Sequence, residues 1–131
     1  MELSRILISH QFKCYNLFVY GTLKSDGANH SRFMAAFKSM AFAQIHGYQI
    51  HYEMGMIFIS PSEYEEVQGE FYTFDSEEDF SYRLSRLDKF EWFEPEAESD
   101  SLYERILVSV VSKEWDGEKL AWAYAAGRRK F

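Results

Sequence analysis

The sequence predicts an α+β domain, in which a mixed, mostly antiparallel sheet closes toward a small barrel and is flanked by two helices. Short apolar runs bounded by turn residues recur along the chain and are typical of strands. Two other segments have the capping residues and the spacing of helices. The 131 residues amount to one domain, so these elements must share its core. The predicted order is strand, helix, three strands, helix, two strands.

The first strand is predicted at 17–20, an apolar, aromatic and β-branched run that ends at Gly21. A glycine at this point indicates a turn into a loop. Asn29 or Ser31 then has a side chain able to cap a short helix that carries apolar residues up to Phe37.

The middle of the chain predicts three strands. Residues 41–59 place aromatic and β-branched side chains around a turn-like segment at 53–55, which is typical of a long hairpin. A further strand is predicted at 67–74. Gly69 within that strand indicates either a bulge or the close approach of another backbone.

The second half predicts a helix and a hairpin. Ser76 precedes an acidic first turn, and both features favour a helix over 77–90. Residues 103–111 alternate between apolar and polar, as a half-buried strand does. The Asp116-Gly117 pair predicts a type I′ turn into a last strand at 120–124.

Composition excludes several classes of protein. The formal charge of −7 argues against nucleic acid as a partner, because a phosphate-binding surface needs an excess of Lys and Arg. The single Cys14 leaves no pair for a disulfide or a zinc site, and no apolar run near the start is long enough for a signal peptide or a membrane span. We therefore expect a cytoplasmic protein without a membrane partner. Residues 1–15 are expected to form an N-terminal extension before a single domain at 16–131.

One carboxylate continues the apolar stripe of the second predicted helix. At about 100° per residue, Phe80, Leu84 and Leu87 share one face, and Glu91 falls in the middle of it. One interpretation is that the helix ends at Phe90 and Glu91 is solvated. The other is a partly desolvated carboxylate whose pKa is raised, which would suit a general base near neutral pH.

The second candidate is the loop that begins after the first strand, at 20–24. Glycine lets successive backbone N–H groups turn outward, so such a loop is able to bind a carboxylate or an oxyanion. An ordinary turn has the same pattern. The segment is too short for a dinucleotide or Walker A motif, and His46 and His51 are too isolated to predict a metal site.

Five groups of residues carry a family pattern. They are 18–24 (FVYGTLK) followed by 27–30 (GANH), then 67–72 (VQGEFY), 87–91 (LDKFE), 103–105 (YER) and 122–124 (WAY). In this order and at this spacing, over about residues 16–125, the chain resembles the gamma-glutamylcyclotransferase-like family. The small gamma-glutamylamine cyclotransferase branch is the most similar.

The resemblance implies an enzyme, a compact barrel with helices, and neither a cofactor nor a metal. Tyr20, Gly21, Thr22 and Leu23 match the family's substrate loop, whose backbone amides hold the glutamyl group. Glu91 matches its catalytic acid and base. The implied partner is a small gamma-glutamyl substrate, and the implied reaction is an intramolecular acyl transfer of the lyase class that releases 5-oxoproline and a free amine or amino acid.

Four further residues have two interpretations each. Tyr103 and Tyr124 are either pocket walls and hydrogen-bond donors or packed core aromatics. Arg105 either pairs with a carboxylate or covers the sheet edge. His30 is not required by the implied mechanism, and helix capping or surface exposure would explain it.

Two departures from the family pattern follow Glu91. Trp92 replaces a glycine that is frequent there, and the acidic insert at 94–100, expected to be a solvated loop, lengthens the connection to the next strand. Two other functions fit the same sequence: a module that binds a small carboxylate without turnover, and a protein that interacts through its acidic surface. A buried Glu91 favours the enzyme, because binding an anion does not benefit from a buried carboxylate.

Overall fold

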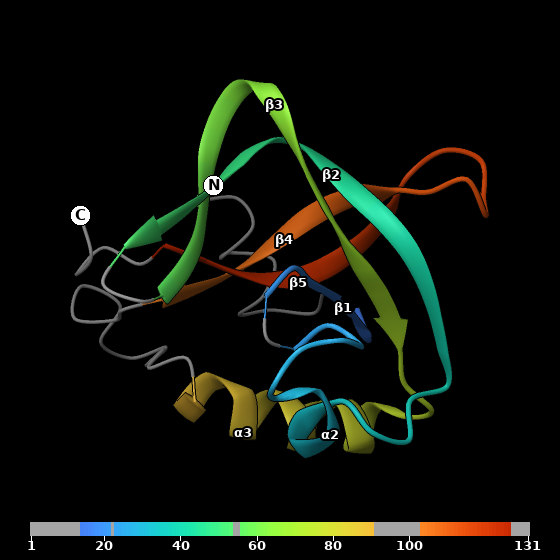
Figure 1. Ribbon diagram of the computed structural model, residues 1–131. Helices are drawn as coiled ribbons and strands as arrows, with labels where there is room; N and C mark the ends of the chain where they lie inside the picture. Colours follow the sequence, from blue (N-terminus) through green and yellow to red (C-terminus); the bar gives the residue numbers. More distant parts are fainter. Residues whose placement is uncertain (1–13, 22, 54–55, 91–102, 127–131) are drawn as a thin grey trace.

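The computed structural model describes residues 14–21, 23–53, 56–90 and 103–126. The expected extension at 1–15 therefore lies almost entirely outside the described residues, as do Thr22, Glu91, Trp92 and the insert at 94–100. Within the described ranges, five strands form a closed barrel and two helices lie together at one end of it (Figure 1).

The strands follow one another around the barrel in the order β1, β3, β2, β4, β5. In chain order the elements are β1 (Asn16–Val19), α2 (His30–Phe33), β2 (Ser39–Glu53), β3 (Met56–Thr73), α3 (Glu77–Phe90), β4 (Tyr103–Val111) and β5 (Lys119–Ala126). Neighbouring strands are antiparallel except β1 and β5, whose parallel pairing at Leu17 and Trp122 closes the barrel. The predicted α+β class and the mostly antiparallel barrel are confirmed.

The prediction of three central strands is wrong, because β3 is one strand of 18 residues. It pairs with β2 on both sides of a register shift, where Gly47 of β2 lies opposite residues 62–65 of β3. Gly47 at this shift has φ +87°, a conformation that favours glycine. Pro61 pairs across from Tyr48, while β1 joins β3 only at the other end. Pro61 therefore lies at a sheet edge, where its missing N–H is tolerated.

The two helices differ in how well their sequence signals predict them. α3 has the predicted bounds, and Ser76 Oγ accepts the backbone N–H of Asp79 at 3.1 Å as expected for a cap. α2 is shorter than predicted, because the chain adopts a left-handed conformation at Ala36 (φ +59°) before Phe37. Asn29 takes the N-cap position but makes no side-chain capping bond.

The connection between β4 and β5 is not the predicted type I′ turn. The last paired residues are Val110 and Lys119, so residues 111–118 lie between them. A type I′ turn requires positive φ at both central positions, and of the Asp116-Gly117 pair only Gly117 has it (φ +74°). The two strands nevertheless pair as the predicted antiparallel hairpin.

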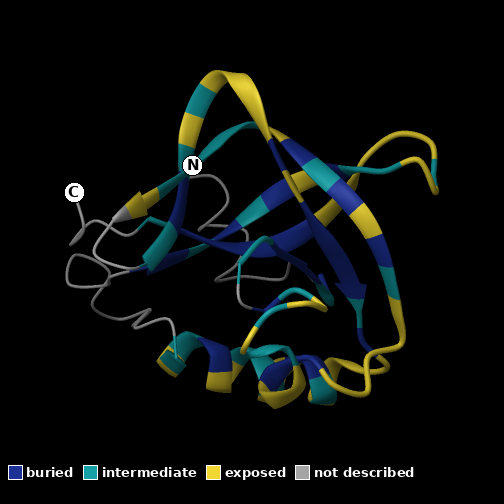
Figure 2. Ribbon diagram, viewed as in Figure 1, coloured by how far each residue is buried: buried dark blue, intermediate teal, exposed yellow. Residues whose placement is uncertain are grey.

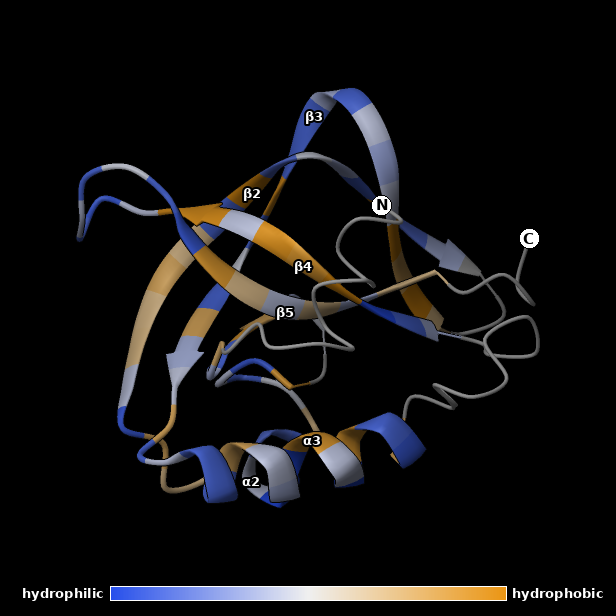
Figure 3. Ribbon diagram, turned by 180° about the vertical axis from the view of Figure 1, so that it is seen from behind, coloured by the Kyte–Doolittle hydropathy of each residue, from blue (hydrophilic) through white to orange (hydrophobic). Residues whose placement is uncertain are grey.

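Buried side chains form two clusters, one on each face of the sheet (Figure 2). The barrel cluster takes residues from all five strands: Phe18, Ala43, Ile45, Ile59, Val67, Phe71, Ile106, Val108, Val110, Ala121, Ala123 and Ala125. The helix-side cluster joins the outer face of the sheet to the helices: Cys14, Leu17, Val19, Leu23, Phe33, Met34, Phe58, Tyr72, Phe74, Phe80, Leu87, Tyr103, Trp122 and Tyr124. Seen from behind, apolar segments run along β4 and β5, above the helices (Figure 3). Both faces of several strands are therefore buried, which explains why their polarity does not alternate simply.

Gly69 lies at the tightest contact between two strands. A Cβ atom at this position would be 2.4 Å from the carbonyl oxygen of Val19 and 2.6 Å from Cζ of Phe18. The ladder is regular here, so of the two predicted alternatives the close backbone approach is confirmed and the bulge is wrong. The missing side chain lets β1 lie directly against β3.

We predict that Gly69→Ala lowers the free energy of unfolding by about 2 kcal/mol or more, because backbone must move to admit the methyl group. Urea denaturation followed by tryptophan fluorescence measures this. Gln68→Ala is the control, since the neighbouring side chain is exposed and should change stability by less than about 0.5 kcal/mol. Equal stabilities for the two variants would contradict the role given to Gly69.

Candidate active site

The loop that follows β1 is attached at both ends of its candidate substrate segment. The hydroxyl of Tyr20 donates to the backbone oxygen of Tyr124 in β5 at 2.5 Å. Leu23 is only 6% exposed and belongs to the helix-side cluster. Two of the four predicted substrate-loop residues thus hold the loop on the barrel, and Gly21 lies between them.

The loop backbone folds as consecutive turns. The N–H of Lys24 donates to Gly21 at 3.1 Å, and the N–H of Gly27 donates to Lys24 at 2.7 Å. Among the described residues, a Cβ atom at Gly21 would meet only Cδ1 of Ile57, at an ordinary 3.8 Å, and the backbone there is not in the left-handed region. The fold therefore does not require a glycine at this position, and a reason outside the fold, such as the approach of a ligand to the backbone, is compatible with its presence.

A buried carboxylate from β3 reaches this loop. Glu70 is 3% exposed, and its two oxygens accept the backbone N–H and the hydroxyl of Ser25, each at 2.7 Å. The hydroxyl of Tyr72 donates to the same carboxylate at 2.8 Å. Burial and the contact with Glu70 raise the pKa of Tyr72, so the phenol is held in its neutral, donating form.

His30 also contacts the loop, which excludes simple surface exposure as its explanation. Its Nδ1 lies 3.0 Å from the backbone oxygen of Leu23, and since a carbonyl only accepts, Nδ1 carries the proton. The same nitrogen lies 3.5 Å from the hydroxyl oxygen of Tyr72. His30 therefore belongs to the hydrogen-bonded groups beneath the loop.

A second carboxylate lies in the last turn of α3. Asp88 accepts the hydroxyl of Tyr124 at 2.5 Å and pairs with Nη1 of Arg105 at 3.3 Å. Burial raises the pKa of Asp88, while Arg105 and the Tyr124 hydrogen bond oppose the rise. Of the two interpretations of Arg105, pairing with a carboxylate is confirmed.

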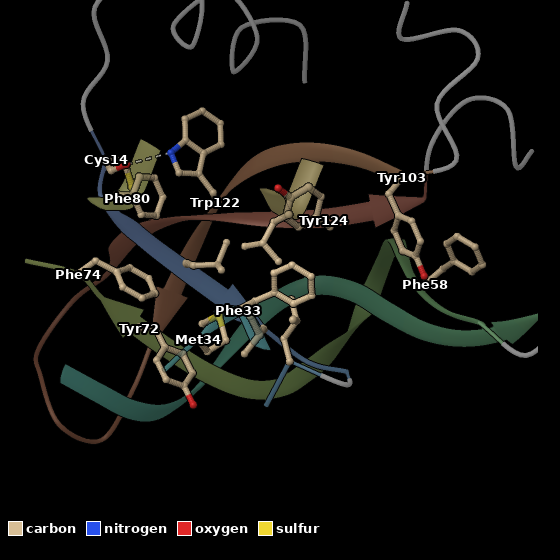
Figure 4. Close-up of a cluster of buried hydrophobic side chains, with 14 residues drawn as sticks. Cys14, Phe33, Met34, Phe58, Tyr72, Phe74, Phe80, Tyr103, Trp122 and Tyr124 are labelled. Atoms are coloured by element: carbon tan, nitrogen blue, oxygen red, sulfur yellow. Dashed lines mark hydrogen bonds between the residues drawn. The ribbon is translucent and has the colours of Figure 1, made fainter. Parts of the chain in front are cut away.

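The aromatic candidates are both buried and both hydrogen-bonded. Tyr103 stacks on Phe58, with 4.6 Å between ring centroids, and its hydroxyl donates to the backbone oxygen of Ile57 at 2.8 Å. Figure 4 shows Tyr103 beside Phe58, and Tyr124 belongs to the same helix-side cluster. Both residues therefore combine core packing with a donor role, so the two interpretations do not exclude each other.

The predicted apolar face of α3 is confirmed over the residues that the structure describes. Phe80 and Leu87 are buried and Leu84 is half-buried against the helix-side cluster. Glu91, the proposed end of this stripe, lies just outside the described residues, after the last residue of α3. Its burial therefore stays a prediction.

Two other expectations concern metals and membranes. In the described ranges, no group of three or more His, Cys, Asp and Glu residues is placed to hold a metal ion. None of the helices in the described part of the chain has the length and apolarity that crossing a membrane requires.

Sequence reasoning singled out neither Glu70 nor Asp88. Both lie in segments that carry the family pattern, but a Glu after a glycine and an Asp near a helix end are ordinarily solvated. The one feature of the sequence that indicates burial of Glu70 is its position next to Gly69, where another backbone was expected to approach.

The family follows from the match to a family model. The model for gamma-glutamyl cyclotransferase, AIG2-like proteins matches residues 17–130. The chain belongs to this family. No curated protein matches this chain. The resemblance given by the five groups of residues is thereby confirmed at the level of the family.

Solved structures show the same fold. A protein from Arabidopsis thaliana, solved in solution, is 24% identical with a TM-score of 0.63, and the match covers 92% of this chain and 74% of that one. An AIG2-like protein from Mus musculus is 26% identical with a TM-score of 0.59, over 87% of this chain and 78% of that one. A structure named gamma-glutamyl cyclotransferase is 20% identical with a TM-score of 0.56, and the match covers 86% of this chain and 66% of that one.

We predict that Asp88→Ala lowers the free energy of unfolding by about 3 kcal/mol, because the half-buried guanidinium of Arg105 loses a carboxylate. Chemical denaturation provides the measurement. Asp79→Ala is the matched control, since Asp79 pairs with Arg83, which is as buried as Arg105 but keeps the backbone oxygens of Phe33 and Ala36 as acceptors, and its loss should change stability by less than about 1 kcal/mol. A loss at Asp88 no larger than at Asp79 would contradict the prediction.

Proposed function

We propose that this protein is a gamma-glutamyl cyclotransferase that releases 5-oxoproline and a free amine or amino acid from a small gamma-glutamyl compound. One observation carries the proposal. Tyr20 donates to the backbone of Tyr124, and the Tyr124 hydroxyl donates to Asp88, three positions before Glu91 in the sequence. The two segments expected to carry the chemistry, the loop after β1 and the C-terminal end of α3, are thus connected through two side chains.

The reaction needs orientation and proton transfer. The α-amine of the glutamyl group attacks its own γ-carbonyl carbon, so the nucleophile is already part of the substrate. The new C–N bond closes a five-membered ring, and the bond to the leaving amine breaks. Glu91 would take the proton that the attacking amine loses and deliver one to the leaving amine. No atom changes its oxidation state, so acid and base chemistry suffices.

The loop would supply the second requirement, a site for negative charge. Backbone N–H groups at Gly21 and Thr22 would hold the substrate's α-carboxylate or the oxyanion that develops on the γ-carbonyl. The described residues leave room for a Cβ atom at Gly21, which supports this role because they do not explain the glycine.

We predict that wild-type protein releases 5-oxoproline from at least one member of a panel of gamma-glutamyl amines and gamma-glutamyl amino acids, and that Glu91→Gln lowers kcat by about 10²- to 10⁴-fold because it removes the acid and base. Mass spectrometry of 5-oxoproline provides the assay, and the preferred panel member identifies the class of leaving group. Glu63→Gln, an exposed glutamate on β3, is the control. Release by neither protein, with a ligand-induced rise in melting temperature, would favour a binding module instead.

Gly21→Ala separates a functional glycine from a structural one. We expect a change in unfolding free energy of less than about 1 kcal/mol, because alanine fits the backbone conformation and the space. We also expect a higher KM for the preferred panel substrate, because the methyl group would hinder the approach of the substrate to the backbone. Thermal unfolding and initial-rate kinetics measure the two effects. Unchanged kinetics in a stable variant would remove the loop from the proposed site.

A further inference from the structure

Glu70 is a charged side chain in a position where the barrel would accept an apolar one. It pairs across from Val19, the last residue of β1, and from Phe42 in β2. Placing a carboxylate at 3% exposure is unfavourable unless hydrogen bonds compensate for the lost water. The hydrogen-bond donors that compensate for the lost water therefore indicate the role of this carboxylate.

Among the described residues, three groups donate to Glu70, and two of them belong to one loop residue. Ser25 donates its backbone N–H to Oε1 and its hydroxyl to Oε2, both at 2.7 Å. Tyr72, the third donor, belongs to the same strand as Glu70. Hydrogen bonds to a charged acceptor are the strong ones, so the carboxylate holds the loop more tightly than a neutral side chain would.

Two other contacts of this part of the loop are described, and one of them comes from the same groups. Lys24 and Asp26, on either side of Ser25, form an exposed ion pair at 3.9 Å, which adds little order. His30 binds the backbone oxygen of Leu23 and lies against Tyr72, which in turn donates to Glu70. The loop is thus held at Leu23 and at Ser25 by one connected group of side chains.

We propose that Glu70 is a positioning residue for the loop that binds the glutamyl group: by accepting both donors of Ser25 it fixes the backbone of residues 23–27 and, through the turn from Gly21 to Lys24, the place of Gly21, whose N–H is proposed to bind the substrate. This inference rests on the proposed function, because the loop positions a substrate only if the protein binds one there. It concerns a residue to which neither the family pattern nor the reaction assigns a role.

The test uses Glu70→Leu in the full chain. Leucine has a similar size and relieves the buried charge, so the variant should remain folded, while Ser25 loses both acceptors. Amide exchange measured by NMR reports this directly at Ser25. This residue is exposed, so the protection of its N–H depends on Glu70, and we expect its protection factor to fall by about tenfold or more.

Two further variants serve as matched controls. Glu66→Leu makes the same substitution on the same strand, at an exposed residue outside the loop contacts, and should leave the exchange at Ser25 unchanged. Glu70→Gln is the conservative replacement. Its amide oxygen still accepts from the Ser25 N–H and from Tyr72, and its NH₂ group donates to the Ser25 hydroxyl, so it should restore most of the protection.

Kinetics on the preferred gamma-glutamyl substrate then test positioning as distinct from stability. We expect KM or kcat to worsen by about tenfold or more in Glu70→Leu, measured at a temperature at which the variant is still folded, and to recover in Glu70→Gln, which also keeps an acceptor for the buried Tyr72 hydroxyl. A rise in KM alone would indicate that the loop amides bind the α-carboxylate of the substrate. A fall in kcat would indicate that they stabilise the oxyanion. Both results support the proposal.

Two results would overturn it. One is unchanged exchange at Ser25 and unchanged kinetics in Glu70→Leu. The other is a variant that only melts earlier while its folded form keeps wild-type KM and kcat. If Glu70→Leu does not fold, Ser25→Ala replaces it, because removal of an exposed hydroxyl leaves the barrel intact and should still raise KM or lower kcat by a few-fold. Unchanged kinetics in Ser25→Ala would then overturn the proposal.

Failure of the proposed function has a different signature. A wild-type protein that neither turns over nor binds any panel compound, yet loses protection at Ser25 in Glu70→Leu, would refute the cyclotransferase and, with it, substrate positioning. Active wild type with an insensitive Glu70 would refute only the inference about Glu70.

Discussion

Closure of the barrel depends on β1, a strand of four residues that pairs with β3 on one side and β5 on the other. So short a strand contributes few hydrogen bonds, and its position is secured by packing. Phe18 enters the barrel cluster, while Leu17 and Val19 face the helix-side cluster. Gly69 allows this strand to approach β3 closely. The candidate substrate loop starts where β1 ends, so its location follows from the same contacts.

The buried carboxylate of Glu70 and the partly buried carboxylate of Asp88 hold the regions around this loop, and the protein stabilises them in different ways. Asp88 pairs with a guanidinium and a phenol, and it joins α3 to β4 and β5. Glu70 accepts from backbone, hydroxyl and phenol groups that carry no charge. Loss of either partner of the Asp88–Arg105 pair would leave the other charge uncompensated, so this pair joins α3 to the barrel. Glu70 instead holds the loop through its hydrogen bonds to Ser25.

The aromatic residues explain how two layers share so small a barrel. In β5, Trp122 and Tyr124 face the helices while Ala121, Ala123 and Ala125 face the barrel interior. Small residues leave room for the rings that other strands place inside the barrel, and the large ones fill the space beneath the helices. Hydrogen bonds then fix the large residues: the indole of Trp122 donates to the backbone of Cys14 at 3.0 Å, as drawn in Figure 4, and the Tyr124 hydroxyl donates to Asp88.

Local signals in the sequence by themselves determined α3, β4 and the pairing of β4 with β5, because capping, helical spacing and alternation act between residues that are near in the chain. The same signals, through the resemblance, singled out the loop after β1. Only the tertiary structure decided that β3 is continuous, that α2 ends before Phe37, and that Glu70 is buried. Each of these depends on a partner distant in sequence: residues 62–65 of β3 bulge opposite Gly47 of β2, Arg83 donates to the backbone oxygens of Phe33 and Ala36 where α2 ends, and Ser25 supplies donors to a carboxylate 45 positions later. Burial and hydrogen-bond partners of this kind arise from the path of the whole chain, which no local pattern encodes.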